Sequence, residues 1–126
     1  MNSEEFAEQV QSFADESLAL LESTLKGTPS LGSDYLNRDT LRASFTLTHP
    51  ITVRKSNSDR LNLECKYRLC TNSSGQHLAV EASTFSIRFR SAKSFVPIVR
   101  FEYDRNARSK PASHFHFHAD STPLGM

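Results

Sequence analysis

The sequence predicts an α+β fold in which one N-terminal amphipathic helix packs on a mostly antiparallel sheet of about five strands. Apolar residues recur every three or four positions through about residues 3–26, which is the period of a helix. They then alternate every second position over about 41–119, which is the period of strands. Between them, 28–38 is rich in Gly, Pro, Ser, Asp and Asn and is expected to be a linker or an irregular loop. A chain of 126 residues suits one domain, 1–126.

The predicted helix has residues suited to its start and its end. Asn2 followed by Glu5, or Ser3 itself, can cap the first turn. Gly27 followed by Pro29 supplies a stop. The apolar stripe consists of Phe6, Val10, Phe13, Leu20, Leu21 and Leu25.

The alternating segments cover about 41–53, 61–70, 78–90, 99–104 and 112–119. A polar cluster at 71–75 can reverse the chain, so the segments on either side of it are expected to form a hairpin. In the third segment the apolar positions change parity, from Leu78 and Val80 to Phe85. That strand must therefore bulge near Ser83 or break into two.

Charge is distributed unevenly along the chain. Residues 1–34 carry a net charge of −6 and residues 35–126 one of +7, although the whole chain carries only +1. Such asymmetry is typical of a surface for an anionic partner such as RNA or DNA. It equally fits an acidic helix lying near basic strands of its own chain. Both interpretations stay open at this point.

Several classes of protein and site are excluded or disfavoured. The chain has neither a long apolar run nor a signal peptide, so we expect a cytoplasmic protein with no membrane partner. Cys65 and Cys70 are five residues apart, which points them to opposite faces of a strand, and both are expected to be free thiols. No Gly-rich phosphate loop is present. His49, before Pro50, is expected to be a turn residue.

The segment His114-Phe115-His116-Phe117-His118 carries the strongest chemical signal. A period of two places the three imidazoles in one row, where neighbouring rings can act as general base and general acid near neutral pH. Arginines on the polar faces of the other strands could stabilise a pentavalent phosphate, as on a metal-independent ribonuclease. The candidate phosphate contacts are Arg68, Arg88, Arg90 and Arg100.

Two further interpretations of the histidine row stay open. Two imidazoles at i and i+2, with a third ligand, could hold a catalytic zinc ion, and His116 and His118 with Asp120 are the favoured set. The outer pair of the row lies about 13–14 Å apart along the strand and cannot share one ion. No other cofactor is expected. The third interpretation is a solvated polar face without chemistry.

The stretch from Ile98 to Asp104, followed by a polar loop with Pro111 and by the histidine-rich strand, resembles small toxin–antitoxin proteins of the TumE type. In those proteins a strand ending in an aromatic-Asp pair precedes a Pro-bearing loop and a His-rich strand. The resemblance covers about 21 of the 126 residues. It implies a prokaryotic, cytoplasmic, sheet-based protein that acts on RNA or binds a cognate partner.

We therefore expect a nucleic-acid-directed component of a toxin–antitoxin-like or phage-defence system, with a His-based ribonuclease as one form of it. The alternatives are a non-enzymatic protein-interaction or antitoxin-like module and a metal-dependent hydrolase built on a His-x-His strand. The sequence leaves open whether the protein is an enzyme. Because a sheet has two edges that can pair with another chain, we also expect a homo-oligomer or a complex with a cognate protein partner.

Overall fold

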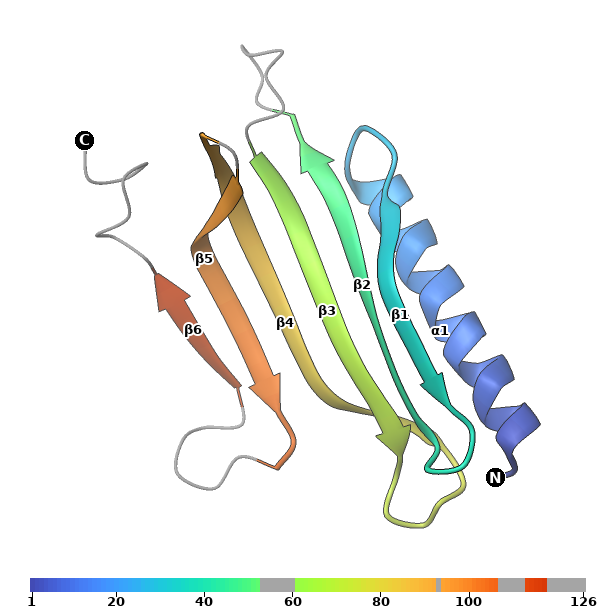
Figure 1. The fold of residues 1–126 in the computed structure, drawn as a ribbon. Helices are drawn as coiled ribbons and strands as arrows, with labels where there is room; N and C mark the ends of the chain where they lie inside the picture. Colours follow the sequence, from blue (N-terminus) through green and yellow to red (C-terminus); the bar gives the residue numbers. More distant parts are fainter. Residues whose placement is uncertain (53–60, 93, 107–112, 118–126) are drawn as a thin grey trace.

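The computed structural model describes residues 1–52, 61–92, 94–106 and 113–117. These residues form a helix and a six-stranded antiparallel sheet whose strands lie side by side in the order of the chain (Figure 1). The α+β fold predicted from the two periods is confirmed. The elements are α1 (Ser3–Thr24), β1 (Ser30–Asn37), β2 (Arg42–Ile51), β3 (Leu61–Thr71), β4 (Leu78–Ser91), β5 (Ser94–Asp104) and β6 (Ser113–Phe117).

Helix α1 begins at the predicted cap. Asn2 Oδ1 accepts a hydrogen bond from the backbone N–H of Glu5 at 2.8 Å, and Asn2 Nδ2 donates to Glu5 Oε1 at 3.2 Å. The helix ends at Thr24, two residues before the predicted end, because Leu25 already has extended backbone angles. Gly27 follows with a φ of +112°, a conformation that residues with a Cβ rarely adopt.

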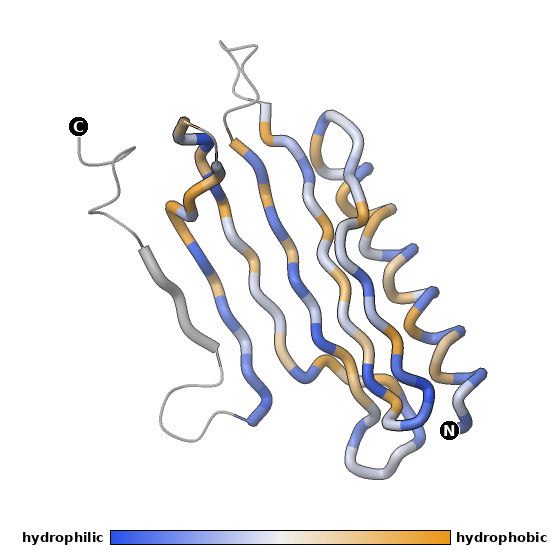
Figure 2. Tube along the Cα trace, viewed as in Figure 1, coloured by the Kyte–Doolittle hydropathy of each residue, from blue (hydrophilic) through white to orange (hydrophobic). Residues whose placement is uncertain are grey.

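The hydrophobic core lies between α1 and one face of the sheet. The ring of Phe13 packs edge-on against Phe45 at 5.8 Å and against Tyr67 at 5.1 Å, and Tyr67 in turn contacts Phe85 at 5.7 Å. These four rings tie α1 to β2, β3 and β4. The alternation of apolar and polar residues that creates this face is visible along β3 in Figure 2. The buried members of the core are Phe6, Ala14, Ala43, Phe45, Leu47, Cys65 and Leu69.

The prediction of a linker or an irregular loop over 28–38 was wrong, because this segment contains the edge strand β1. All of its residues except Asn37 are exposed, so β1 shows no alternation of apolar and polar residues that could have revealed it. Its register with β2 also shifts between Leu31 and Asp34. Backbone pairing with β2, which sequence periodicity does not report, holds this strand in place. The sheet accordingly has six strands where about five were expected.

A bulge in β4 accounts for the change of parity, which is the first of the two predicted alternatives. Arg68 pairs with Ala82 and Leu69 with Val80, so Glu81 has no cross-strand partner on β3 and β4 continues unbroken. The carboxylate of Glu81 instead forms an ion pair with Arg42 of β2. The bulge lets β4 keep its apolar residues on the core side both before and after it.

The two cysteines are free thiols, as predicted. Cys65 is buried in the core, and burial, with a smaller contribution from the nearby Glu64 carboxylate, raises the pKa of its thiol to about 11. Cys70 is half-buried. Within the described part of the chain, no helix combines the length and the apolar character of a membrane span.

A candidate site on the polar face of the sheet

One face of the sheet points away from the core and carries many charged and hydroxyl side chains. We name this face of the sheet the polar face. Cross-strand pairing arranges its centre in two neighbouring rows across β3, β4 and β5: the Glu64 row (Glu64, Ser86, Arg100) and the Lys66 row (Lys66, Thr84, Glu102). Residues directly opposite each other in an antiparallel sheet have Cβ atoms about 4.5–5.5 Å apart. The register therefore brings together groups that are far apart in the chain.

The two rows surround a hollow of about 270 Å³. Phe95 and Pro97 of β5 form an apolar wall beside the charged groups. The guanidinium carbon of Arg88 lies 5.2 Å from the centre of the Phe95 ring, and that of Arg90 lies 6.0 Å from it. The hollow thus combines cationic groups, carboxylates, hydroxyls and one aromatic ring.

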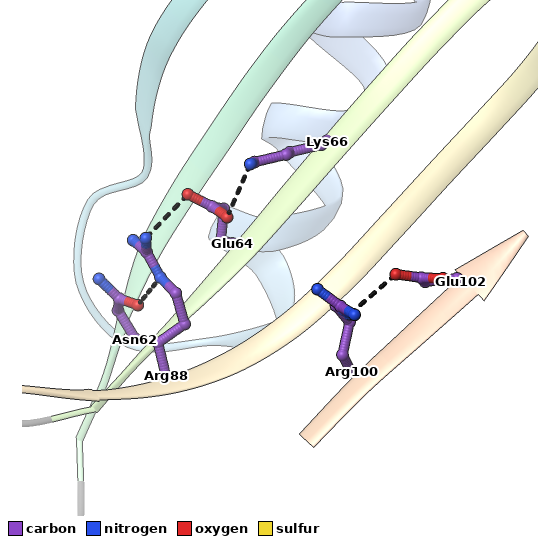
Figure 3. Close-up of polar contacts among 6 residues, drawn as sticks. All are labelled: Asn62, Glu64, Lys66, Arg88, Arg100 and Glu102. Carbon is purple, nitrogen blue, oxygen red and sulfur yellow. Dashed lines mark hydrogen bonds and ion pairs between the residues drawn. The ribbon is translucent and has the colours of Figure 1, made fainter. Parts of the chain in front are cut away.

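Ion pairs hold the charged side chains of the hollow in place (Figure 3). Glu64 Oε2 lies 2.9 Å from Arg88 Nη1, and Glu64 Oε1 lies 3.7 Å from Lys66 Nζ. Arg88 Nε donates a hydrogen bond to Asn62 Oδ1 at 2.9 Å. The Arg88 and Glu64 side chains are only 21% and 16% exposed, so this pair is screened less than an ordinary surface ion pair.

Arg100 forms the second ion pair of the hollow. Its Nε lies 2.8 Å from Glu102 Oε1 on the same strand. Two residues of one strand that are two positions apart lie on one face, so this pair links the Glu64 row to the Lys66 row. This contact is an ion pair by distance only, because the Arg100 Nε has no hydrogen-bond partner among the described residues. A guanidinium group has five N–H donors in a planar fork, so donors remain for another ligand.

All four predicted phosphate contacts lie on β3, β4 or β5 at positions of the polar face. Arg88 and Arg100 line the hollow, and both already contact a carboxylate there. Arg90 is exposed beside the ring of Phe95. Arg68 is exposed and lies in a separate hollow near Arg42. Their contact with phosphate stays a prediction.

The backbone of β6 brings two of the three predicted catalytic histidines to the edge of this site. In the register of β5 with β6, His116 pairs with Arg100 and His114 pairs with Glu102. His116 thus occupies the next position of the Glu64 row, and His114 the next position of the Lys66 row. His118 lies outside the described residues.

Most of the predicted zinc ligands lie outside the residues that the structure describes. His118 and Asp120 are not among the described residues, and for His116 only the backbone position is described. Among the side chains of residues 1–52, 61–92 and 94–106, no three His, Cys, Asp or Glu residues converge as metal ligands would. The zinc interpretation therefore stays a prediction.

His49, expected at a turn, instead lies inside β2 and is fully buried on the core side. Its Nδ1 is 2.7 Å from the carbonyl oxygen of Pro50, and because a carbonyl only accepts, Nδ1 carries the proton. Its Nε2 is buried without a hydrogen-bond partner among the described residues. His49 faces away from the polar face and does not belong to the candidate site.

Sequence reasoning did not single out Glu64, Lys66 or Ser86, although each contributes to the hollow. Their alternation placed them on the polar side of their strands. The register of the strands could not be predicted, and the register determines which residues of neighbouring strands lie opposite each other.

No protein-family model, curated protein or solved structure matches this chain. The resemblance to TumE-type proteins stays a prediction.

Proposed function

We propose that the polar face binds single-stranded RNA and that the histidines of β6 cleave it, in a component of a prokaryotic toxin–antitoxin-like or phage-defence system. The observation that carries the proposal is the cross-strand register. It places His116 opposite Arg100 and His114 opposite Glu102, at the end of two rows that begin with Glu64 and Lys66. General acid–base groups and phosphate-binding cations thereby occupy neighbouring register positions.

The chemistry would be a transesterification that needs no metal. One imidazole removes the proton from a ribose 2′-hydroxyl, whose oxygen attacks the adjacent phosphorus. The bond from phosphorus to the 5′-oxygen breaks, and the second imidazole donates a proton to that oxygen. The products are a 2′,3′-cyclic phosphate and a free 5′-hydroxyl. Arg100 and Lys66 would stabilise the negative charge that develops on the phosphoryl oxygens.

The aromatic wall supports binding of a single strand. Unpaired bases stack on aromatic rings and on guanidinium planes, each stack contributing about 1–3 kcal/mol. Phe95 with Arg88 and Arg90 offers both kinds of surface side by side. A duplex would not present its bases to this wall, so the proposal is specific for unpaired RNA.

Binding is tested by fluorescence anisotropy with a labelled single-stranded RNA at about 100 mM salt, where phosphate contacts still dominate affinity. Arg100→Gln and Lys66→Gln should each weaken binding several-fold. Lys26→Gln, which removes the same charge from the exposed segment after α1, is the matched control and should leave the affinity unchanged. Equal effects of all three substitutions would indicate nonspecific attraction and would refute the assigned site.

Cleavage is tested separately, with gel assays in the presence of a chelator. Wild type should produce cyclic-phosphate ends, and His116→Ala should bind RNA normally but cleave it at least about a hundredfold more slowly, the usual scale of an acid–base contribution. Expression in a bacterial host provides a second readout. A harmless wild type that degrades no RNA, with or without added metal, excludes the ribonuclease.

A non-enzymatic protein-interaction module is the second candidate, and a separate observation favours it. The apolar face of the sheet extends beyond the part that α1 covers, so that Ile87 of β4 is 38% exposed and Phe101 of β5 is 41% exposed. These two residues belong to neighbouring strands. If RNA binding and cleavage both fail, while a pull-down from the native host recovers one partner in stoichiometric amount, this function replaces the first.

A further inference from the structure

We propose that the outer edge of β1, together with the groove between β1 and α1, binds an extended basic segment of a partner protein as a seventh strand of the sheet. The groove lies on the helix side of the sheet, between α1 and β1, and not on the polar face, so the inference does not depend on the RNA function. Three features carry the inference: an open strand edge, an apolar groove beside it, and the negative charge of Asp34 in the groove.

The first feature is the edge itself. Among the strands that the structure describes, β1 is terminal and pairs only with β2, so the backbone N–H and C=O groups on its outer side can accept another strand. After the register shift at Leu31 and Asp34, β1 pairs regularly with β2 from Asp34 to Asn37. A regular four-residue stretch, exposed except at Asn37, is the part suited to accept a new strand.

The second feature is a groove of about 230 Å³ that runs between α1 and β1. Val10 and Ala14 of α1 form one wall, and Leu31 and Leu36 of β1 form the other. Leu31 is 47% exposed and Leu36 is 39% exposed, which leaves apolar area for an incoming side chain to cover.

The third feature is charge. Asp34 lines the groove and pairs in register with the core residue Phe45, so it lies on the helix-facing side of β1. Glu4 and Glu8 of α1 are exposed at a neighbouring hollow, which Arg38 also lines. The ion pairs found among the described residues all join side chains of the sheet, and none neutralises α1. Arg38 is the basic residue that lies beside Glu4 and Glu8, whereas the hollow that Asp34 lines contains no basic residue.

These features define the chemistry of the occupant. Asp34 and Leu36 are two positions apart on the helix-facing side of β1, so the partner strand needs a Lys or Arg and an aliphatic residue two positions apart on its own inner side. A second copy of this chain fits poorly, because pairing β1 with β1 would bring two acidic α1 helices together. A nucleic acid would be repelled by the same charges.

The probe is a fluorescein-labelled peptide, Thr-Lys-Thr-Val-Thr-Lys-Thr-Val-Thr, whose alternate residues present lysine and valine to the groove. The control peptide carries Glu in place of both lysines. We expect saturable binding of the first peptide only, with amide NMR shifts concentrated in β1 and α1. Equal binding of both peptides, or no saturation by the lysine peptide at millimolar concentration, overturns the proposal.

Two substitutions with the same change in charge locate the site. Asp34→Lys should weaken binding of the lysine peptide at least tenfold, whereas Glu22→Lys, at an exposed position near the end of α1, should change it less than twofold. Asp34→Asn should weaken it about three- to fivefold and covers the case in which Asp34→Lys fails to fold. Equal effects at Asp34 and Glu22 overturn the site. So does sedimentation that shows the wild type to be a dimer joined through β1.

Discussion

Replacing Glu64 with Gln should have opposite effects on stability and on RNA affinity, which makes it the most informative single substitution in this protein. The change keeps the size of the side chain but removes the charge that holds Arg88 and Lys66. Stability should fall because the ion pairs are lost. Affinity for RNA should rise because a negative charge leaves the proposed binding surface and two cations are released.

The magnitude follows from the burial of the pair. Exposed ion pairs contribute about 0–1 kcal/mol, whereas breaking a fully buried one costs about 3–5 kcal/mol. With Arg88 at 21% and Glu64 at 16% exposure, the pair lies between these limits, and we expect a loss of about 1–2 kcal/mol. For a chain of this size that corresponds to a fall in Tm of about 3–8 °C. The affinity for RNA should rise about two- to fivefold at low salt.

Urea unfolding measures the first effect and fluorescence anisotropy the second. Glu22→Gln is the matched control, because it removes the same charge from an exposed helix position and should change stability by less than about 0.5 kcal/mol. A double-mutant cycle with Arg88→Gln isolates the pairwise energy. If Glu64→Gln weakens RNA binding, the carboxylate contributes to the site and the proposed role of Arg88 and Lys66 is wrong.

Three further predictions concern the core, the alkaline limit of stability and the metal. Leu47→Ala should destabilise the fold by about 2–5 kcal/mol in urea unfolding, because Leu47 is fully buried, whereas Leu20→Ala at a 66% exposed position should cost far less. The pKa of the Cys65 thiol is raised to about 11, so the neutral thiol is favoured in the folded state and stability should be lost as pH rises from about 9 to 11. Unfolding curves should lose this dependence in Cys65→Ala and keep it in Cys70→Ala. Elemental analysis of protein purified without an affinity resin should find no stoichiometric zinc, and zinc that disappears in His116→Ala would establish the metal site instead.

The elements that could be predicted from the sequence are those in which burial of one face produces a periodic pattern of apolar residues. α1 has one face in the core, and β2 and β3 each alternate between the core and the polar face, so their types and approximate bounds were correct. The bulge at Glu81 was also predictable, because a change of parity within one strand can be accommodated in few ways.

The features that escaped prediction depend on pairing between strands and not on burial. β1 is exposed on nearly every residue and left no period to detect. The polar side of each strand could be assigned, but the register that makes Glu64, Ser86 and Arg100 neighbours is fixed by loop lengths and bulges. His49 was misplaced because Pro50 suggested the end of a strand, whereas β2 continues through it to Ile51.

The sequential order of the strands has a consequence for how the sheet assembles. In the described sheet every strand pairs only with its neighbours along the chain, so each pairing joins segments that are close in sequence. Folding can begin at the central hairpins, where Phe13 of α1 packs against Phe45 and Tyr67. It can then spread outward one strand at a time. The outermost strands then form last and open first, and amide hydrogen exchange should be slowest in β3 and fastest towards the two edges.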